Sequence, residues 1–273
     1  MKIKFYGTRG SIPVCEPGFQ EFGGNTTCLK ISFEDSGRIG ILDAGTGIRK
    51  LGRELQAQDE YQDEIVIAFS HFHWDHIQGF PFFNPAFDPT KKLVLIALGK
   101  GREIHNLEEI FAFQMQGAYF PVQMENMGAQ FEFMQPNLNI LTIRGTKSTA
   151  LRHHHPGGAF TYKFERNGRS FAFCTDIEHG ETIDQNLVEF CKGIDVLIHD
   201  AQYTEEQLKR KKGWGHSSFE QAIQVAEMSG AGRLIMTHHD PDHDDEFLRK
   251  KEKECQDRFK DCILAREGME FDV

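Results

Sequence analysis

The sequence predicts an α+β fold in which two β-sheets pack face to face with helices on their outer surfaces. Short apolar runs of strand length recur through both halves of the 273-residue chain, and segments with helical spacing follow several of them. No low-complexity linker, internal repeat or change in composition separates the halves. We therefore expect residues 1–273 to form one domain of two packed sheets flanked by helices.

The first half is expected to supply one sheet and its helices. Asp43-Ala-Gly-Thr-Gly47 predicts a tight turn that leads into a helix, because Ile48, Leu51 and Leu55 fall on one helical face. Residues 80–89 are expected to form a loop rich in Pro and Phe. The expected strands are Lys2–Tyr6, Thr26–Glu34, Gly40–Asp43, Glu64–Phe69 and Lys91–Ala97, with a turn at Asp35–Arg38.

An insertion is expected around residues 101–136. Arg102–Gln116 is a candidate helix, and Gly117–Pro136 is expected to be irregular and is rich in Phe and Met. One interpretation is ordinary core beneath a long insertion. The alternatives are a lid over a cleft or the face of a homodimer, since an exposed apolar patch of this size favours association.

The second half repeats the order of strand and then helix. Asn167-Gly168 predicts a hairpin turn. Capping boxes at Thr182–Gln185 and Ser217–Glu220 predict two helix starts, the second helix ending near Gly230, and Asp244–Lys260 predicts a charged helix. The expected strands are Leu138–Arg144, Thr149–His154, Gly158–Arg166, Arg169–Thr175, Asp195–His199 and Arg233–Thr237, with a closing segment at Ile263–Val273.

Composition restricts the class of protein. The formal net charge of −10 disfavours a protein that binds long polyanions through its general surface. The N-terminus lacks the apolar core of a signal peptide, and no run is long enough to span a bilayer. The six cysteines form no C-x-x-C pair, which disfavours both a cysteine zinc site and a disulfide framework. We therefore expect a cytoplasmic protein with no membrane partner.

The stretch Ser70–Gly79, SHFHWDHIQG, is the most informative part of the chain. Three histidines and an aspartate fall within six residues directly after a predicted buried strand, and they are His71, His73, Asp75 and His76. Imidazole and carboxylate suit Zn²⁺ and neighbouring divalent metals. Four ligands are too many for one open ion once other segments contribute, so a two-metal site is expected. A plain polar cluster is the alternative, but desolvating four unpaired polar groups is costly.

Polar residues also end four later apolar runs. Strands that deliver ligands to one edge of a sheet should present them at their C-terminal ends. The residues in question are His153-His154-His155, Asp176, His199-Asp200 and His238-His239. One such case would be unremarkable, because strand ends are usually solvated, but four together with the histidine-rich stretch indicate a shared site.

This ordered set resembles the metallo-β-lactamase-fold hydrolases, over nearly the whole chain. The resemblance implies a four-layer αββα sandwich. The matching residues are Asp43 before Gly45-x-Gly47, then His71-x-His73-x-Asp75-His76, then a later histidine, Asp176 and His238.

The resemblance implies two metal ions, expected to be Zn²⁺, with Mn²⁺ or Fe²⁺ as alternatives. One ion would be held by His71, His73 and His155. The other would be held by Asp75, His76 and His238, and Asp176 would bridge the two ions.

Neighbouring residues leave some of these assignments open. His155 is favoured because it precedes Pro156-Gly157-Gly158, as in the phosphodiesterase branch of the family, and His153 is the alternative. His238 is favoured over His239 because it directly follows an apolar strand. Asp43 is expected to accept a hydrogen bond from a ligand imidazole rather than to bind metal.

A second motif points to the reaction. Trp214-Gly-His216-Ser-Ser218 resembles the Gly-His-Ser-Thr element of tRNA 3′-processing endonucleases and cyclic-phosphate diesterases, with Ser218 in place of Thr. Asp200 matches the acidic residue that orients this histidine. The resemblance implies a metal-bound hydroxide as nucleophile, oriented by Asp75, and His216 as general acid held by Asp200. The basic run Lys209–Lys212 is expected to be a solvated helix end, although it could attract phosphate.

The preferred function is hydrolysis of a small cyclic phosphodiester, with no stable nucleic-acid complex. The tRNA-processing relatives carry a long basic arm between the positions that match His155 and Asp176, where this chain has about one hairpin. The alternatives within the fold are a tRNA 3′-end endonuclease and a lactone or thioester hydrolase. A di-iron redox centre is disfavoured by His73, because such members usually carry a carboxylate there. A non-catalytic nucleic-acid-binding module is disfavoured by the intact ligand set.

Overall fold

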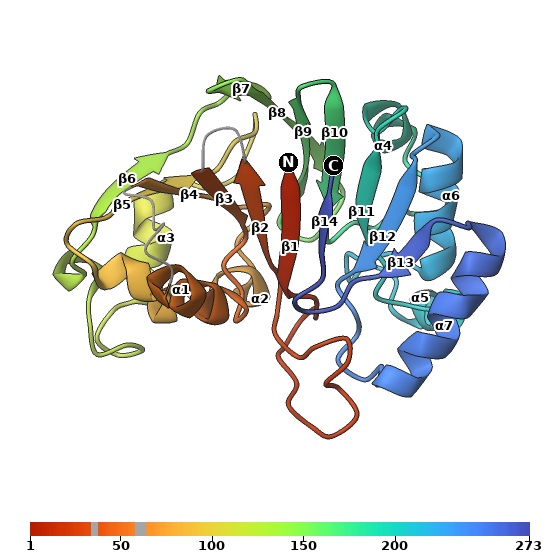
Figure 1. Cartoon of the computed structure of the whole chain (residues 1–273), viewed down its shortest axis with the longest axis horizontal. Helices are drawn as coiled ribbons and strands as arrows, with labels where there is room; N and C mark the ends of the chain where they lie inside the picture. The colour runs from red at the N-terminus through yellow and green to blue at the C-terminus, as the bar shows by residue number, and fades with distance from the viewer. Residues whose placement is uncertain (34–37, 58–63) are drawn as a thin grey trace.

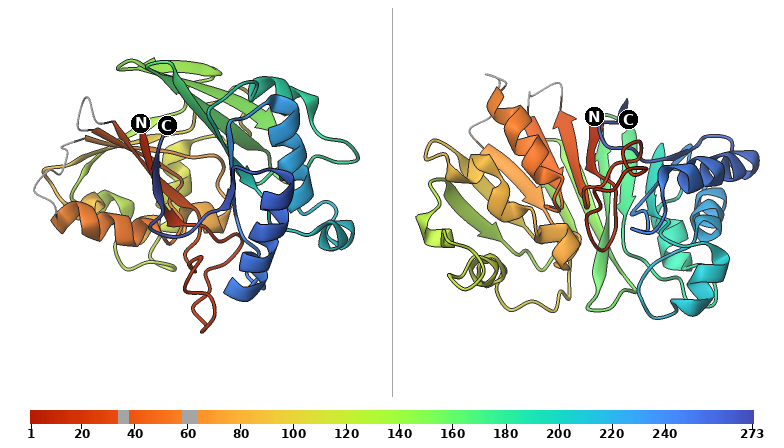
Figure 2. Two further views of the ribbon diagram at one scale, coloured as in Figure 1. Left: turned by 45° about the vertical axis from the view of Figure 1, so that its right-hand side comes forward. Right: turned by 90° about the horizontal axis from the view of Figure 1, so that it is seen from below.

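The computed structural model describes residues 1–33, 38–57 and 64–273. Within these residues, two seven-stranded sheets pack face to face, and helices cover the outer face of each sheet (Figures 1 and 2). This arrangement confirms the predicted α+β sandwich with four layers in the order αββα. No helix in the described ranges has the length and apolar character needed to cross a membrane.

The first sheet is built from the N-terminal half of the chain and its last strand. Four neighbouring strands of this sheet, β3 to β6, run parallel, and the remaining pairs are antiparallel. The order in space is β14 (Glu270–Asp272), β1 (Lys2–Gly7), β2 (Cys28–Phe33), β3 (Arg38–Leu42), β4 (Glu64–Ala68), β5 (Lys92–Ile96) and β6 (Gln130–Met134). The helical elements of this half are α1 (Ile48–Ala57), α2 (Trp74–Ile77), α3 (Leu107–Gln114), η1 (Phe80–Phe82), η2 (Asn84–Phe87) and η3 (Met124–Asn126).

The second sheet is built from the C-terminal half. Its strands β10 to β13 run parallel, whereas β7 to β10 form an antiparallel meander. The order in space is β13 (Cys262–Leu264), β12 (Arg233–Thr237), β11 (Val196–Asp200), β10 (Arg169–Cys174), β9 (Ala159–Arg166), β8 (Thr146–His153) and β7 (Ile140–Ile143). The helices are α4 (Gln185–Phe190), α5 (Glu205–Arg210), α6 (Phe219–Ser229) and α7 (Asp245–Arg258).

Three apolar clusters hold the layers together. Side chains such as Phe5 and Phe173 fill the space between the sheets. Leu51 of α1 and Phe111 of α3 pack on the outer face of the first sheet, and Ile223 of α6 packs on the outer face of the second. The spacing that predicted α1 is confirmed, because the face bearing Leu51 is buried in the way an amphipathic helix requires.

The predicted insertion is largely core. Phe111, Met115 and Met124 are buried against the first sheet, while Phe113 and Tyr119 are exposed. The prediction of irregular structure throughout Gly117–Pro136 is wrong, because Gln130–Met134 form strand β6, which pairs in parallel with β5. Phe131 and Phe133 alternate with polar neighbours and pack on the helix-side core, which is the period of a half-buried strand.

Several helix boundaries also differ from the predictions. Helix α4 is capped by Asp184 and not Thr182, and α6 is capped by Ser218 and not Ser217, because those side chains accept the exposed backbone N–H groups. Helix α3 begins only after its cap, Asn106. Helix α5 ends in the run Lys209–Lys212, which the sequence predicts as a helix end, but its start at the capping box of Thr204 was not predicted. The predicted turn at Asp35–Arg38 lies outside the described residues, apart from Arg38.

The register of the parallel strands sets up one functional edge. Leu42 of β3 lies opposite Ala68 of β4 in the first sheet. In the second sheet Cys174 lies opposite His199, and Asp200 lies opposite Thr237. Within each sheet, the segments that follow these parallel strands therefore leave at the same level. In parallel α/β sheets this carboxyl edge is where ligands usually bind.

Candidate metal centre

Loops after four strands bring seven ligand-type side chains together at the carboxyl edge. The loop after β4, with the one-turn helix α2, supplies an adjacent set from the first sheet. Single residues after β8, β10 and β12 face that set from the second sheet. The seven residues are His71, His73, Asp75, His76, His155, Asp176 and His238. These are the residues that the sequence predicts as metal ligands, and the fold places them in two groups that share Asp176.

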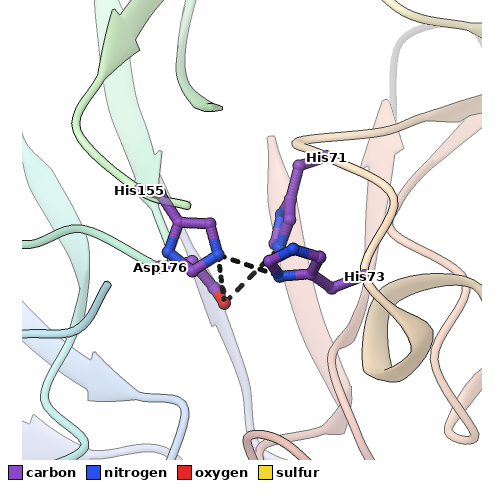
Figure 3. A group of neighbouring side chains, drawn as sticks. All are labelled: His71, His73, His155 and Asp176. Atoms are coloured by element: carbon purple, nitrogen blue, oxygen red, sulfur yellow. Dashed lines mark hydrogen bonds and ion pairs between the residues drawn. The ribbon is translucent and has the colours of Figure 1, made fainter. Parts of the chain in front are cut away.

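The first group contains His71, His73, His155 and Asp176 (Figure 3). His155 Nε2 lies 2.9 Å from His73 Nδ1. Asp176 Oδ2 lies 3.6 Å from His71 Nε2 and 3.8 Å from His155 Nε2. The three imidazoles thus converge on one oxygen of the carboxylate.

The second group uses the other oxygen of the same carboxylate. Asp176 Oδ1 lies 3.1 Å from His76 Nε2 and 3.3 Å from His238 Nε2. Asp75 Oδ2 lies 3.3 Å and 3.1 Å from the same two nitrogens. Asp176 therefore faces both groups at once, which is the position required of a bridging ligand.

The chemistry of these donor sets fits two divalent cations. Donor atoms in a tetrahedral site with bonds of about 2.1 Å lie roughly 3.4 Å apart, and the contacts above scatter around that value. His71 Nε2 is buried and has no hydrogen-bond partner among the described residues. Orphaned buried nitrogens are costly unless something binds them, and mixed imidazole and carboxylate donors suit Zn²⁺, Mn²⁺ or Fe²⁺.

On the first-sheet side, Asp43 and Ser70 orient the ligand imidazoles. His76 Nδ1 lies 2.8 Å from Asp43 Oδ2, as the sequence predicts. Ser70 donates its hydroxyl to Asp43 (2.7 Å) and lies 3.1 Å from His71 Nδ1. Both rings are thereby held with Nε2 directed at the cluster. Such outer hydrogen bonds fix the tautomer and the orientation of metal-binding histidines.

On the second-sheet side, groups outside the predicted set of residues orient the imidazole rings. His155 Nδ1 donates to the carbonyl oxygen of Gly215 (2.8 Å), and His238 Nδ1 donates to Gln202 Oε1 (2.9 Å). On the first-sheet side, the backbone N–H of Ser11 donates to Asp75 Oδ2 (2.8 Å). A backbone carbonyl and N–H carry no sequence signal of their own. Gln202 lies two residues after Asp200, and that proximity is the one signal that could have identified it.

The electrostatics prepare the carboxylates to act as ligands. Burial raises the pKa of Asp176, but His238, His76 and His71 outweigh it and hold the pKa well below its usual value. Burial also raises the pKa of Asp75, which His76 and His238 lower far more. Both groups are therefore ionised at neutral pH, as metal binding requires.

The histidines divide into two electrostatic classes. Burial lowers the pKa of His71 well below its usual value and that of His155 to about 4, so both rings are neutral and ready to ligate. Burial also lowers the pKa of His76 and His238, but Asp176 and the other nearby carboxylates outweigh it. The pKa of His76 rises well above its usual value, and that of His238 rises to about 9. Metal binding at the second group must therefore displace protons.

The predicted acid and its orienter lie beside the second group. His216 Nδ1 donates to Asp200 Oδ2 (2.8 Å), and the His216 ring stacks on His238 with centroids 4.9 Å apart. The other oxygen of Asp200 accepts from the backbone N–H groups of Ser217 (3.0 Å) and Gln202 (3.1 Å). The carboxylate is therefore immobile, and Nε2 is the ring nitrogen of His216 that is left for chemistry.

The alternative histidines lie outside the two groups. His153 bonds Thr161 Oγ1 through Nδ1 and the carbonyl oxygen of Asp176 through Nε2. His239 Nε2 bonds the carbonyl oxygen of Ala265. Both side chains make these hydrogen bonds outside the two groups, in which the structure places His155 and His238.

Comparisons with known proteins identify the family. The family model described as "Beta-lactamase superfamily domain" matches residues 40–239. Ribonuclease BN of Escherichia coli O127:H6 is 34% identical over 100% of both chains.

Two solved structures share the fold. A diphosphatase of the PhnP family superposes with a TM-score of 0.73 at 17% identity, covering 100% of this chain and 97% of that one. The short form of human tRNase Z superposes with a TM-score of 0.69 at 18% identity, covering 100% and 99%. At these identities the solved structures establish the fold alone. Together with the family match, they show that this chain belongs to the beta-lactamase superfamily and has the metallo-β-lactamase fold.

Proposed function

We propose that this protein is a metal-dependent phosphodiesterase that hydrolyses a small cyclic phosphodiester, with His216 as general acid. One observation carries the proposal. His216 and Asp200 form a hydrogen-bonded pair next to the two groups of candidate ligands that share Asp176. Hydrolysis of a diester with an alkoxide leaving group needs this combination, because the alkoxide leaves poorly unless it is protonated.

The seven ligand-type residues would hold the two ions in the groups described above. Bound there, two divalent ions would activate water for attack and neutralise charge on the phosphate oxygens. The protein itself supplies the orientation of the ligands, through Asp43, Ser70, Gln202 and the carbonyl oxygen of Gly215.

Proton delivery is the task of His216. Its Nδ1–H is held by Asp200, which fixes the orientation of the ring and leaves Nε2 free to carry the proton that is transferred. The Nε2 proton can then pass to the leaving oxygen of the substrate. The ring is held on its other side by stacking on His238, so its distance from the second group is fixed.

Two exposed tryptophans support a substrate with a planar group. The two tryptophans of the chain flank the cluster in sequence. Trp74 lies between His73 and Asp75 and is 61% exposed, and Trp214 lies two residues before His216 and is 59% exposed. The Lys211 ammonium lies 4.1 Å from the centroid of the Trp214 ring. Exposed indoles, one of them beside a cation, favour a nucleotide, whose base can stack and whose phosphate is anionic.

A tRNA 3′-end endonuclease is the second candidate. The relatives named ribonuclease BN and tRNase Z favour it. Against it, the chain between His155 and Asp176 contains only the β9–β10 hairpin, and the net charge is −10. A protein that binds a long polyanion needs basic surface to do so.

A substrate panel tests the proposal. Purified protein with its metal content measured should hydrolyse cyclic nucleotides and bis(p-nitrophenyl) phosphate, and should not process pre-tRNA or open a lactone. His216→Ala should keep its metal and lose about 10²- to 10⁴-fold of its rate on cyclic nucleotides. Processing of pre-tRNA at a higher kcat/KM than any cyclic nucleotide would replace the proposal with the second candidate. Full activity of His216→Ala would show that His216 is not the general acid.

A further inference from the structure

The loop that carries His216 is tied to the metal cluster through a buried glutamate. Glu178 Oε1 accepts from the backbone N–H of Gly213 (2.8 Å), and Glu178 Oε2 accepts from Gly213 (3.0 Å) and Gly215 (2.9 Å). The carbonyl oxygen of Gly215 in turn accepts from His155 Nδ1 (2.8 Å). One carboxylate therefore fixes the loop that both presents the acid and orients a ligand.

We propose that Glu178 is a positioning residue for proton transfer. It holds the loop of residues 213–217 against His155, and this sets where His216 meets the leaving group. The inference rests on the proposed function of His216, and it adds a residue for which the sequence motifs gave no role.

The surroundings of Glu178 argue against a general structural role. The residue is 8% exposed, and within the described ranges it takes part in no ion pair. Burying a carboxylate without a cation is costly, and backbone N–H groups that converge on it offset that cost. The hydrogen bonds of this side chain go to the loop before His216. The buried carboxylate therefore stays hydrogen-bonded only while the loop keeps this conformation.

The glycines show that the loop must approach the cluster closely. Gly213 and Gly215 have φ of +86° and +90°, in the region that other residues adopt only with strain. A Cβ atom on Gly215 would lie 2.1 Å from His155 Nδ1. The absence of a side chain lets the backbone carbonyl reach the ligand, and Glu178 holds both glycines from the opposite side.

The segment that contains Glu178 also contacts the loop beyond His216. Ser217 Oγ donates to the carbonyl oxygen of Ile177 (2.6 Å), and the backbone N–H of Glu178 donates to the carbonyl oxygen of His154 (3.0 Å). Because Glu178 lies two residues after Asp176, the loop that carries His216 is connected to the Asp176 carboxylate as well as to His155. A shift of the loop would change the distance between His216 and the candidate metal ligands.

Rates on two substrates with different leaving groups distinguish a role of Glu178 in positioning His216 from a general loss of structure. p-Nitrophenolate leaves without protonation, whereas the alkoxide of a cyclic nucleotide needs the acid. In Glu178→Gln an NH₂ group replaces one of the two acceptor oxygens, and the negative charge that strengthens the hydrogen bonds to both glycines is lost. We expect kcat for a cyclic nucleotide to fall about tenfold or more, with the rate on bis(p-nitrophenyl) phosphate within about twofold of wild type and unchanged metal content. Glu181→Gln, an exposed neighbour, is the matched control.

A double variant asks whether the effect passes through His216. On a His216→Ala background, Glu178→Gln should cause no further loss on the cyclic nucleotide. Equal losses on both substrates, or a full loss on the His216→Ala background, would overturn the inference. If Glu178→Gln does not fold, Glu178→Asp is judged by the same ratio, since its shorter carboxylate cannot reach both glycines.

A readout without catalysis keeps the inference separate from the proposed function. In a Trp74→Phe background, Trp214 is the one remaining tryptophan and lies between the two glycines that Glu178 holds. Time-resolved anisotropy of Trp214 should show greater local motion after Glu178→Gln and no change after Glu181→Gln. Unchanged motion would overturn the inference even in an active enzyme. If wild type hydrolyses no diester, the proposed function fails while the anisotropy still decides whether Glu178 holds the loop.

Discussion

The two sheets contribute to the candidate metal site in different ways. The first sheet supplies His71, His73, Asp75 and His76 from one loop and one helical turn after β4. The second sheet supplies single residues after separate strands. A local cluster needs only one correct turn to form, whereas a dispersed set depends on the register of a whole sheet. The geometry of the set from the first sheet, called the first half of the site, should therefore tolerate changes elsewhere in the fold. The geometry of the set from the second sheet, called the second half of the site, should not.

Asp176 is where the two halves meet, so its removal should have the largest effect. Asp176→Asn leaves one oxygen to serve two groups and places an amide nitrogen against histidine nitrogens. We expect fewer than two ions per chain and a loss of activity of about 10³-fold or more. Elemental analysis and diesterase assays measure both. His73→Ala, which affects one group only, is the comparison, and two tightly bound ions in Asp176→Asn would contradict the bridging role.

The partners of the ligand histidines test the two halves directly. Asp43→Ala removes the acceptor of His76 on the first-sheet side, and Gln202→Ala removes the acceptor of His238 on the second. Each change should weaken metal affinity about 10- to 100-fold. We expect the larger loss for Asp43, because Ser70 also depends on it. Competition with a chelator measures both affinities, and an equal or larger loss in Gln202→Ala would contradict the greater dependence on Asp43.

The same division explains what the sequence could predict. A histidine-rich stretch after an apolar run is visible without any structure, and strand ends marked Asp176 and His238 as candidates. The supporting contacts were different, because the carbonyl oxygen of Gly215 and the N–H of Ser11 belong to the backbone and have no residue type to recognise. Glu178 was missed because a carboxylate that binds two N–H groups resembles any surface glutamate in sequence. The strand at Gln130–Met134 was missed because its Phe and Met content was attributed to an irregular insertion.

Buried histidines next to the second sheet should make the free energy of unfolding depend on pH. Burial lowers the pKa of His179 to about 2, with His199 and His153 as smaller causes. The unfolded chain therefore binds a proton below about pH 6.5 that the folded protein excludes, and stability falls as pH drops through that value. In metal-free protein, His179→Gln should flatten the slope of the unfolding free energy by about 1.4 kcal/mol per pH unit. Urea titrations at pH 5 and 7 measure this, and an unchanged slope would mean that His179 does not contribute.

The smallest expected effect concerns the helix that follows the acid. Ser218 caps α6 by accepting from the backbone N–H of Gln221 (3.1 Å), and the Gln221 side chain accepts from the N–H of Ser218 (3.1 Å). Ser218→Ala should lower the free energy of unfolding by about 1 kcal/mol, whereas Ser218→Thr should keep the cap. The cap lies two residues beyond His216, but Asp200 holds the ring independently. Urea unfolding should therefore detect the loss in Ser218→Ala, while the ratio of rates on a cyclic nucleotide and bis(p-nitrophenyl) phosphate stays constant. A changed ratio would mean that the acid is positioned by the helix start as well as by Glu178.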